Sequence, residues 1–256
     1  MRLLLDLGNT RLKWALVSAD NWVARGAAAW EEDVSAALTQ AWREQGQPQQ
    51  VLGASVVDAS REAQIESIVA EVFARPVDWV RTPAEACGVR IAYAEPQRLG
   101  VDRFLAMVAA HAAGASPCVL AGIGTALTLD ALTADGQHLG GLIAPGPLLM
   151  QQSLFGATAR VKPYQPGAIR DIADNTADAV VSGCWQAVAA LIERFATKVA
   201  KQSGGTPCLL LDGGDAATLL PLLGLPAELA ADSVLRGLNV WAATSNRLSH
   251  PSHPSS

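Results

Sequence analysis

The sequence contains few charged residues and no run of basic side chains. Charged residues make up 17% of the 256 positions, and the net charge is −5. A dedicated nucleic-acid-binding protein normally carries a basic patch that neutralises phosphates, so this class is not favoured. Half of the residues are hydrophobic, which is typical of a globular protein with a sizeable core and not of a disordered chain.

Signals for membrane insertion or export are also missing from the sequence. No uninterrupted apolar stretch has the length of about 20 residues that a transmembrane helix needs. The first residues lack the pattern of a signal peptide, because Asp6 interrupts the apolar run almost at once. We therefore expect a cytoplasmic protein with neither a membrane nor a nucleic acid as its partner.

Cysteine and histidine are scarce, with four of each. The cysteines are scattered, with no C-x-x-C pair: Cys87, Cys118, Cys184 and Cys208. This pattern favours reduced thiols in a cytoplasmic protein, and it makes a zinc site improbable. His250 and His253 lie in a Ser/Pro/His tail that we predict to be disordered from about residue 249.

The opening of the chain combines two apolar runs with an acid, a glycine and a lysine between them. Residues 3–7 and 12–17 predict two antiparallel strands joined by a tight turn. Gly8 would let backbone N–H groups approach a phosphate, and Lys13 would add a positive charge for its oxygens. Asp6, at the end of a strand, could hold Mg²⁺ directly or through its waters. The alternative interpretation is an ordinary hairpin turn.

The rest of the first half alternates strands with helices. Strands are expected at residues 22–27, 51–57 and 77–80, and helices at 31–45, 60–73 and up to about 111. This order is typical of an α/β domain. The sequence Gly114-Ala115-Ser116-Pro117 then breaks the chain, so we place a domain boundary there, with a first domain at residues 1–115 and a second at 116–256.

The second half begins much as the first does. Strands are expected at residues 119–123, 126–131, 139–144 and 209–212, and helices up to 155, at about 177–201 and at 233–248. The order strand, Gly-Thr or Gly-Asn-Thr turn, strand therefore occurs twice, about one domain apart, which indicates a duplicated fold. Two such halves facing each other across a cleft would place both turns on one nucleotide.

A second glycine turn strengthens the nucleotide interpretation. Gly213 and Gly214 follow an apolar strand and precede a helix start. Two residues without a Cβ would let the backbone lie flat against an adenine or a ribose. The alternative is a plain turn between a strand and a helix.

A series of short motifs runs in order from residue 6 to residue 216. They are Asp6-x-Gly8-Asn9-Thr10-x-x-Lys13, Tyr93, Gly100-Val101-Asp102-Arg103, Gly124-Thr125-Ala126-x-Thr128-x-Asp130, Gly140-Gly141-x-Ile143-x-Pro145-Gly146, Asn175-Thr176 and Gly213-Gly214-Asp215-Ala216. In this order and spacing they resemble the type III pantothenate kinase family. The resemblance implies an α/β fold of two ribonuclease-H-like domains, in the acetate and sugar kinase/Hsp70/actin superfold. It also implies ATP-dependent phosphorylation of pantothenate to 4′-phosphopantothenate, at the entry to coenzyme A synthesis.

The resemblance also assigns roles to individual residues. ATP, with its Mg²⁺ close to Asp6, would be bound by Asp6, Leu7, Gly8, Asn9, Thr10, Arg11, Leu12, Lys13, Thr125, Gly213 and Gly214. Pantothenate would be bound by Tyr93, Gly100, Val101, Asp102, Arg103 and Thr176.

Asp102 matches the family's catalytic base. A carboxylate within hydrogen-bond reach would align the primary alcohol with the γ-phosphorus and accept its proton late in the transfer. The guanidinium of Arg103 would suit the pantothenate carboxylate. From the residues alone, Asp102 could instead be a carboxylate at a helix start paired with Arg103. Likewise Tyr93 could be a partly buried tyrosine, and Thr176 could be the N-cap of the long helix.

Members of this family are cytoplasmic homodimers that use a monovalent cation such as potassium or ammonium, so the resemblance implies the same here. In the family an aspartate precedes the second turn, in an Asp-x-Gly-Thr pattern associated with this cation. Here the stretch is Gly122-Ile123-Gly124-Thr125, so the acid is missing. A cation site without it has fewer charged oxygen ligands, and we expect activation to need a higher potassium concentration.

Two other functions remain open on the sequence. One is a kinase of the same superfold that phosphorylates another small alcohol or carboxylate. The other is a catalytically weak nucleotide-binding protein that acts through a partner, which the glycine at position 122 would fit. The presence of Asp6, Lys13 and Asp102 argues against the second, because a non-catalytic protein needs no base.

Overall fold

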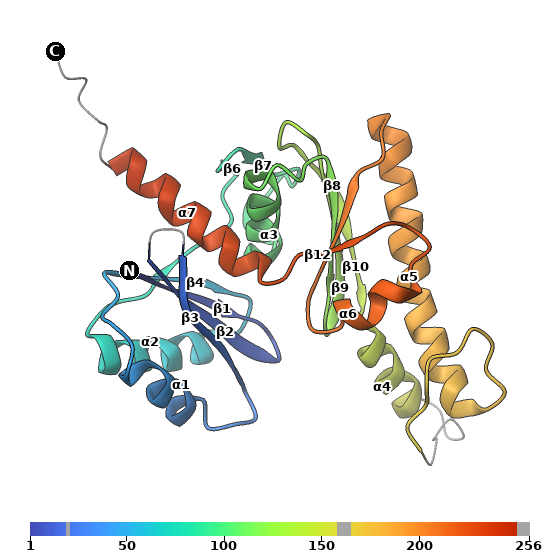
Figure 1. The fold of residues 1–256 in the computed structure, drawn as a ribbon, viewed down its shortest axis with the longest axis horizontal. Coiled ribbons are helices and arrows are strands. Elements are labelled where there is room, and N and C mark those ends of the chain that lie inside the picture. The colour runs from blue at the N-terminus through green and yellow to red at the C-terminus, as the bar shows by residue number, and fades with distance from the viewer. Residues whose placement is uncertain (19–20, 158–164, 250–256) are drawn as a thin grey trace. The chain divides into compact units, whose positions relative to one another are not determined.

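The computed structural model describes residues 1–18, 21–157 and 165–249. The tail predicted to be disordered from about residue 249 lies outside this part of the chain. The chain divides into two compact units (Figure 1). The first contains residues 1–114 together with the segment from Ser233 onward, and the second contains Ala115–Asp232.

The first unit is built on a mixed sheet with the strand order β3-β2-β1-β4-β5. Its strands are β1 (Arg2–Leu7), β2 (Arg11–Ser18), β3 (Asn21–Ala29), β4 (Gln50–Ser55) and β5 (Asp78–Trp79). Strand β1 is antiparallel to β2 and parallel to β4. Successive strand residues point to opposite faces, so Leu3, Leu5 and Leu7 share one face. They belong to the core that also buries Trp42 and Phe73.

Two helices with capped N-termini pack their apolar side chains into the same core. Helix α1 (Val34–Arg43) begins after Asp33, whose carboxylate accepts a hydrogen bond from the Ala36 backbone N–H at 3.0 Å. Helix α2 (Ala59–Phe73) begins after Asp58, which accepts from the N–H groups of Ser60 and Arg61. The Ser60 hydroxyl also donates to this carboxylate, and this bond, followed by that from the Arg61 N–H, holds the pKa of the Asp58 carboxyl below its usual value. The caps thus fix where the two helices start against the sheet.

Helices α3 (Val101–Ala112) and α7 (Ser233–Ser249) complete the first unit. They pack against each other, and both contact β4, while α7 also contacts β1. The Phe104 and Trp241 rings meet edge to face, with centroids 5.9 Å apart. Gly237 allows close approach, because a Cβ there would overlap the backbone carbonyl of Leu105. The structure therefore differs from the predicted second domain, residues 116–256: its last helix covers the sheet of the first unit.

The second unit repeats the first sheet. Its strands are β8 (Cys118–Ile123), β9 (Ala126–Leu132), β10 (His138–Pro145), β11 (Cys208–Asp212) and β12 (Glu228–Leu229). Their order is β10-β9-β8-β11-β12, with β8 antiparallel to β9 and parallel to β11. The predicted duplication is confirmed, because order and directions match those of the first sheet. One face of this sheet packs against α5 (Thr176–Ser203) and α6 (Ala216–Leu219), and α4 (Pro147–Ala157) follows β10.

Shorter elements join these parts. They are β6 (Glu85–Ala86), β7 (Val89–Arg90), and the 3₁₀ helices η1 (Pro96–Arg98) and η2 (Leu220–Leu222).

Helix α5 is the described helix that has the length and composition of a membrane span, with a mean hydropathy of 1.2 over its most apolar window. Trp185, Val188 and Ile192 of this helix are nevertheless buried against the second sheet. A core helix of a folded domain has the same composition as a span, and these contacts assign α5 to the core.

Candidate active site

The first predicted phosphate loop is a tight turn between β1 and β2. The Gly8 backbone N–H donates to the Arg11 carbonyl oxygen at 3.1 Å, which closes the turn. Asn9, Thr10 and Arg11 are exposed, so their side chains and backbone are accessible to a ligand. The arrangement fits the predicted role, since a small exposed turn with a glycine can surround a phosphate with N–H groups.

Two residues that the sequence analysis missed hold this turn in place. The indole N–H of Trp30 donates to the Gly8 carbonyl oxygen at 2.7 Å, and Arg61 donates to the Asn9 carbonyl oxygen at 3.2 Å. The Arg61 guanidinium lies 4.8 Å from the centre of the Trp30 ring, within the range of a cation–π interaction. The carbonyl oxygens of Gly8 and Asn9 are thereby hydrogen-bonded to the protein.

The predicted residues of this turn divide between two faces of the sheet. Leu7 and Leu12 are fully buried in the core of the first unit, so only their backbone could meet a nucleotide. Asp6 and Lys13 lie opposite each other in register on β1 and β2, on the other face, and both are partly exposed. Opposite charges at such positions attract, which places a carboxylate and an ammonium together beside the turn.

The predicted catalytic residue lies in the first turn of α3. The Asp102 carboxylate accepts a hydrogen bond from the Arg103 backbone N–H at 2.8 Å. A Cβ at Gly100 would collide with the same carboxylate, so this glycine makes room for it. The position of Asp102 and its hydrogen bond agree with the alternative interpretation of this residue as a carboxylate at the start of a helix. Asp102 is also partly exposed, as a base must be.

The predicted pantothenate residues of the first unit lie close together. Arg103 is only 6% exposed. Its guanidinium donates to the Tyr93 hydroxyl at 3.2 Å and lies 5.9 Å from the centre of that ring. Because burial removes a charge from water, the guanidinium favours an anionic partner. Val101 is buried, so its side chain serves packing.

The glycines of the second unit meet around its turn. Gly124 closes the turn by donating to the Ala126 carbonyl oxygen at 3.1 Å, and Gly146 donates to the Thr125 carbonyl oxygen at 2.9 Å. A Cβ at Gly146 would overlap the backbone of Gly124, and one at Gly213 would overlap the backbone of Ile123. Gly213 also has a φ of 106°, which other residues rarely adopt. The close contacts thus require these two glycines, and they leave Thr125 and Gly214 exposed.

Thr176 lies at the start of α5, on the lining of a hollow of about 900 Å³ between α4 and α5. It is not the N-cap: Asn175 fills that role by accepting a hydrogen bond from the Asp178 N–H at 3.0 Å. The backbone N–H of Ala168, followed by the Asn175 side chain, holds the pKa of the Asp178 carboxyl below its usual value. Thr176 therefore lines the hollow and does not act as the cap of the helix.

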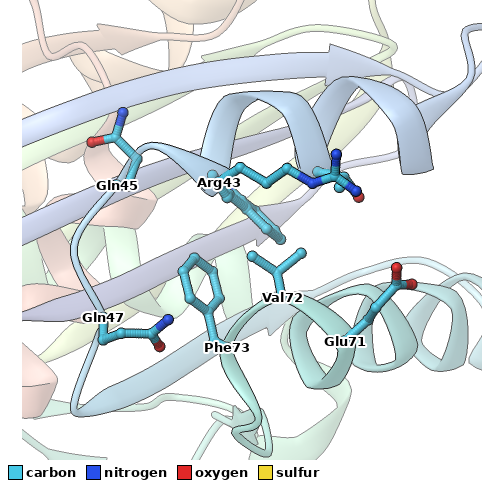
Figure 2. A pocket seen from close by; sticks show the side chains of 8 residues that line it. Arg43, Gln45, Gln47, Glu71, Val72 and Phe73 are labelled. Atoms are coloured by element: carbon cyan, nitrogen blue, oxygen red, sulfur yellow. The ribbon is translucent and has the colours of Figure 1, made fainter.

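A separate surface hollow lies between the C-terminal ends of α1 and α2 (Figure 2). Its volume is about 190 Å³, and its labelled lining is Arg43, Gln45, Gln47, Glu71, Val72 and Phe73. It shares no residue with the predicted site, and its lining brings together no group of catalytic side chains.

Among the residues that the structure describes, no group of three or more His, Cys, Asp or Glu side chains is placed to hold a metal ion. Such a protein can still hold Mg²⁺ through one carboxylate and the phosphates of a nucleotide. Asp6, at the first turn, fits this arrangement.

Comparison with known proteins gives one consistent family. A family model described as type III pantothenate kinase matches residues 2–198. A type III pantothenate kinase of Aromatoleum aromaticum is 40% identical, over 94% of this chain and 98% of that relative. One of Xanthomonas campestris pv. campestris is 43% identical, over 94% of this chain and 97% of that relative.

A solved structure supports the fold independently. A protein from Sinorhizobium meliloti, assigned as a 2-dehydro-3-deoxygalactonokinase, matches with a TM-score of 0.56 at 16% identity, over 98% of this chain and all of that one. At this identity the match shows the fold alone, and it confirms the predicted sugar-kinase superfold of two ribonuclease-H-like units. With the family model and the relatives in agreement, the chain belongs to the type III pantothenate kinase family.

Proposed function

We propose that this protein transfers the γ-phosphoryl group of ATP to the primary alcohol of pantothenate, giving 4′-phosphopantothenate and ADP. Family membership supports the reaction. The observation that carries the residue assignment is the pairing at α3: a partly exposed carboxylate, Asp102, beside the buried Arg103 and its Tyr93 partner.

The two halves of the acceptor site have distinct tasks. Arg103, fixed by the Tyr93 hydroxyl, binds the pantothenate carboxylate as a fork, and this anchors the substrate. Asp102 accepts a hydrogen bond from the primary alcohol and so orients its oxygen. As the new O–P bond forms and the bond to ADP breaks, the alcohol proton passes to Asp102. Gly100 and Val101 shape the backbone on which these side chains stand, and Thr176 supplies a hydroxyl contact from the second unit.

The turns of the two units serve ATP. The backbone from Asp6 to Lys13 contacts the phosphates, with Lys13 as a point charge. Thr125, Gly213 and Gly214 contribute from the second unit. Asp6 would hold Mg²⁺, which neutralises charge on phosphate oxygens when it is bound with ATP. A monovalent cation, potassium or ammonium, would add to this near the second turn.

The test is an ADP-release assay on the purified protein. Pantothenate, glycerol, acetate and hexoses are offered in parallel, with and without potassium. We expect turnover with pantothenate and none with the other acceptors. Release that requires glycerol, acetate or a hexose would assign a different acceptor, and release with none of them would leave the chain without kinase activity.

We further propose that the enzyme is a two-fold homodimer in the cytoplasm. Five large apolar side chains of β10 and α4 are exposed: Leu142, Ile143, Leu148, Leu149 and Leu154. Leu142 and Ile143 follow each other on the strand, so they point to opposite faces of the sheet, and Ile143 is the more exposed of the two. Large exposed apolar side chains on a folded domain can mark interaction surfaces. A second copy bound there would also cover the hollow lined by Leu154 and Thr176, which suits a small substrate.

We expect Ile143→Lys, at a side chain that is 65% exposed, to convert the dimer to a monomer because it buries an unpaired charge in the interface. Light scattering at micromolar concentration measures the mass. Val23→Lys is the matched control, since Val23 is 56% exposed on β3 of the first unit. A wild-type protein that is monomeric and fully active would contradict the dimer.

A further inference from the structure

Each of the two sheets has a carboxylate near the end of a central strand, but the strand that carries it differs between them. Strand β8 corresponds to β1, and β11 to β4, because the sheets share one order and one set of directions. In the first sheet, Asp6 of β1 lies in register with Ala54 of β4. In the second sheet, Gly122 of β8 lies in register with Asp212 of β11. The first sheet therefore has its carboxylate on the central strand β1, whereas the second has it on β11, the strand next to β8.

Asp212 lies on the same face of its sheet as Gly122. Ile123, which follows Gly122, and Leu211, which precedes Asp212, both belong to the core that packs against α5. Since strand residues alternate between faces, Gly122 and Asp212 both lie on the opposite face. Neighbouring strands are about 4.8 Å apart. The Asp212 carboxylate therefore stands next to the position where β8 has no side chain.

The surroundings of this carboxylate suit a hard cation, which takes oxygen ligands. Asp212 Oδ1 accepts a hydrogen bond from the Gly213 N–H at 2.6 Å, so the carboxylate is held at the glycine turn. On the other side of Gly122, the Thr128 hydroxyl oxygen lies 2.7 Å from the place that a Cβ at position 122 would occupy. The cluster thus offers an anionic oxygen and a hydroxyl beside the second turn.

We propose that Asp212 supplies the anionic ligand for the cation that accompanies the ATP phosphates at the second turn, as Asp6 would at the first. This inference rests on the proposed function, because it takes ATP as the nucleotide. From Gly122 alone we expected a weakened cation site, but with Asp212 the site keeps a carboxylate, supplied by β11 and not by β8. We therefore expect cation affinity to be retained despite Gly122.

The test separates the charge of Asp212 from its place in the turn. Asp212→Asn keeps an oxygen that accepts the Gly213 N–H and removes only the charge. Binding of a non-hydrolysable ATP analogue is measured by calorimetry in the absence of pantothenate. In one arm potassium is titrated at fixed Mg²⁺, and in the other Mg²⁺ is titrated at fixed potassium. We expect the half-effect concentration of one cation to rise about tenfold or more in the variant, and the arm that changes identifies the cation.

A second-site rescue makes the assignment specific. Gly122→Asp is placed in the Asp212→Asn background, and Gly122→Ala in the same background is the matched control. Gly122 does not have a positive φ, so a side chain there requires only that the Thr128 hydroxyl turn away. We expect the aspartate to restore the cation response and the alanine to leave it weak.

Failure of the Asp212 role and failure of the kinase assignment give different results. Titrations of Asp212→Asn that superimpose on those of the wild type, in both arms, would overturn the role of Asp212 while leaving the kinase assignment intact. Equal rescue by aspartate and alanine would overturn it as well, since no carboxylate would then be needed. A wild-type protein that binds no ATP analogue under any condition would overturn the proposed function, and this inference with it.

Discussion

Replacing Asp102 by asparagine should lower kcat for pantothenate by about 10²–10⁴-fold, the range usual for loss of a general base, while ATP still binds. Asparagine has nearly the same shape, and its carbonyl oxygen can keep the hydrogen bond that Asp102 accepts from the Arg103 N–H. Helix α3 should therefore start as before. What is lost is the group that we propose orients the alcohol and takes its proton.

Two measurements check this expectation. Turnover gives kcat, and calorimetry with an ATP analogue gives nucleotide affinity, which should stay unchanged because the turns proposed to bind ATP lie at the strand ends near Gly8 and Gly124. Glu71→Gln is the control, since it makes the same chemical change at an exposed carboxylate of α2. Wild-type turnover by Asp102→Asn would remove this residue from the mechanism.

The second large effect should come from the packing of α7 against the rest of the first unit. Leu238 is completely buried, and deletion of a buried leucine side chain to alanine costs about 2–5 kcal/mol. We expect Leu238→Ala to destabilise the protein by this amount. Leu229→Ala, at a leucine that is 51% exposed on β12, removes the same atoms and should have a much smaller effect. Urea unfolding measures both.

Hydrogen exchange then shows which unit has been weakened. If α7 belongs to the first unit, Leu238→Ala should accelerate exchange in β1, β4 and α3 and spare β8 and β11. Gly237→Ala should act in the same direction, because its methyl group would meet the Leu105 carbonyl of α3. Faster exchange confined to β8 and β11 would instead indicate that α7 belongs to the second unit.

Much of the fold follows from local sequence patterns. The apolar run at residues 3–7, and the second apolar run after the glycine turn, predict β1 and β2 because two short apolar runs joined by a tight turn are typical of paired, buried strands. The repeat of this pattern around Gly124 predicts the duplication. The assignment of α7 could not be obtained in this way, because an amphipathic helix shows which of its faces is buried but not which sheet covers that face.

The site shows the same division between local and non-local information. The turn at Gly8 and the carboxylate of Asp102 stand out in the sequence, since their residue types and spacing are local. Trp30 and Arg61 do not, because they reach the first turn from other elements. The relation of Asp212 to Gly122 depends on strand register, which the sequence alone does not reveal. The alternative that Thr176 is the N-cap of α5 was wrong because the preceding residue, Asn175, is an equally good cap and takes that position.

Because α7 belongs to the first unit, the two units need not fold in the order in which their first residues are synthesised. The second unit is one continuous segment, Ala115–Asp232, whereas the first needs the segment from Ser233 onward. On the ribosome, residues 1–114 emerge before the second unit, yet β1, β4 and α3 must wait for α7, their last packing partner, until the whole second unit has been synthesised. The later unit can therefore close its core before the earlier one, with Leu4 and Phe104 exposed to water and to chaperones in the interval.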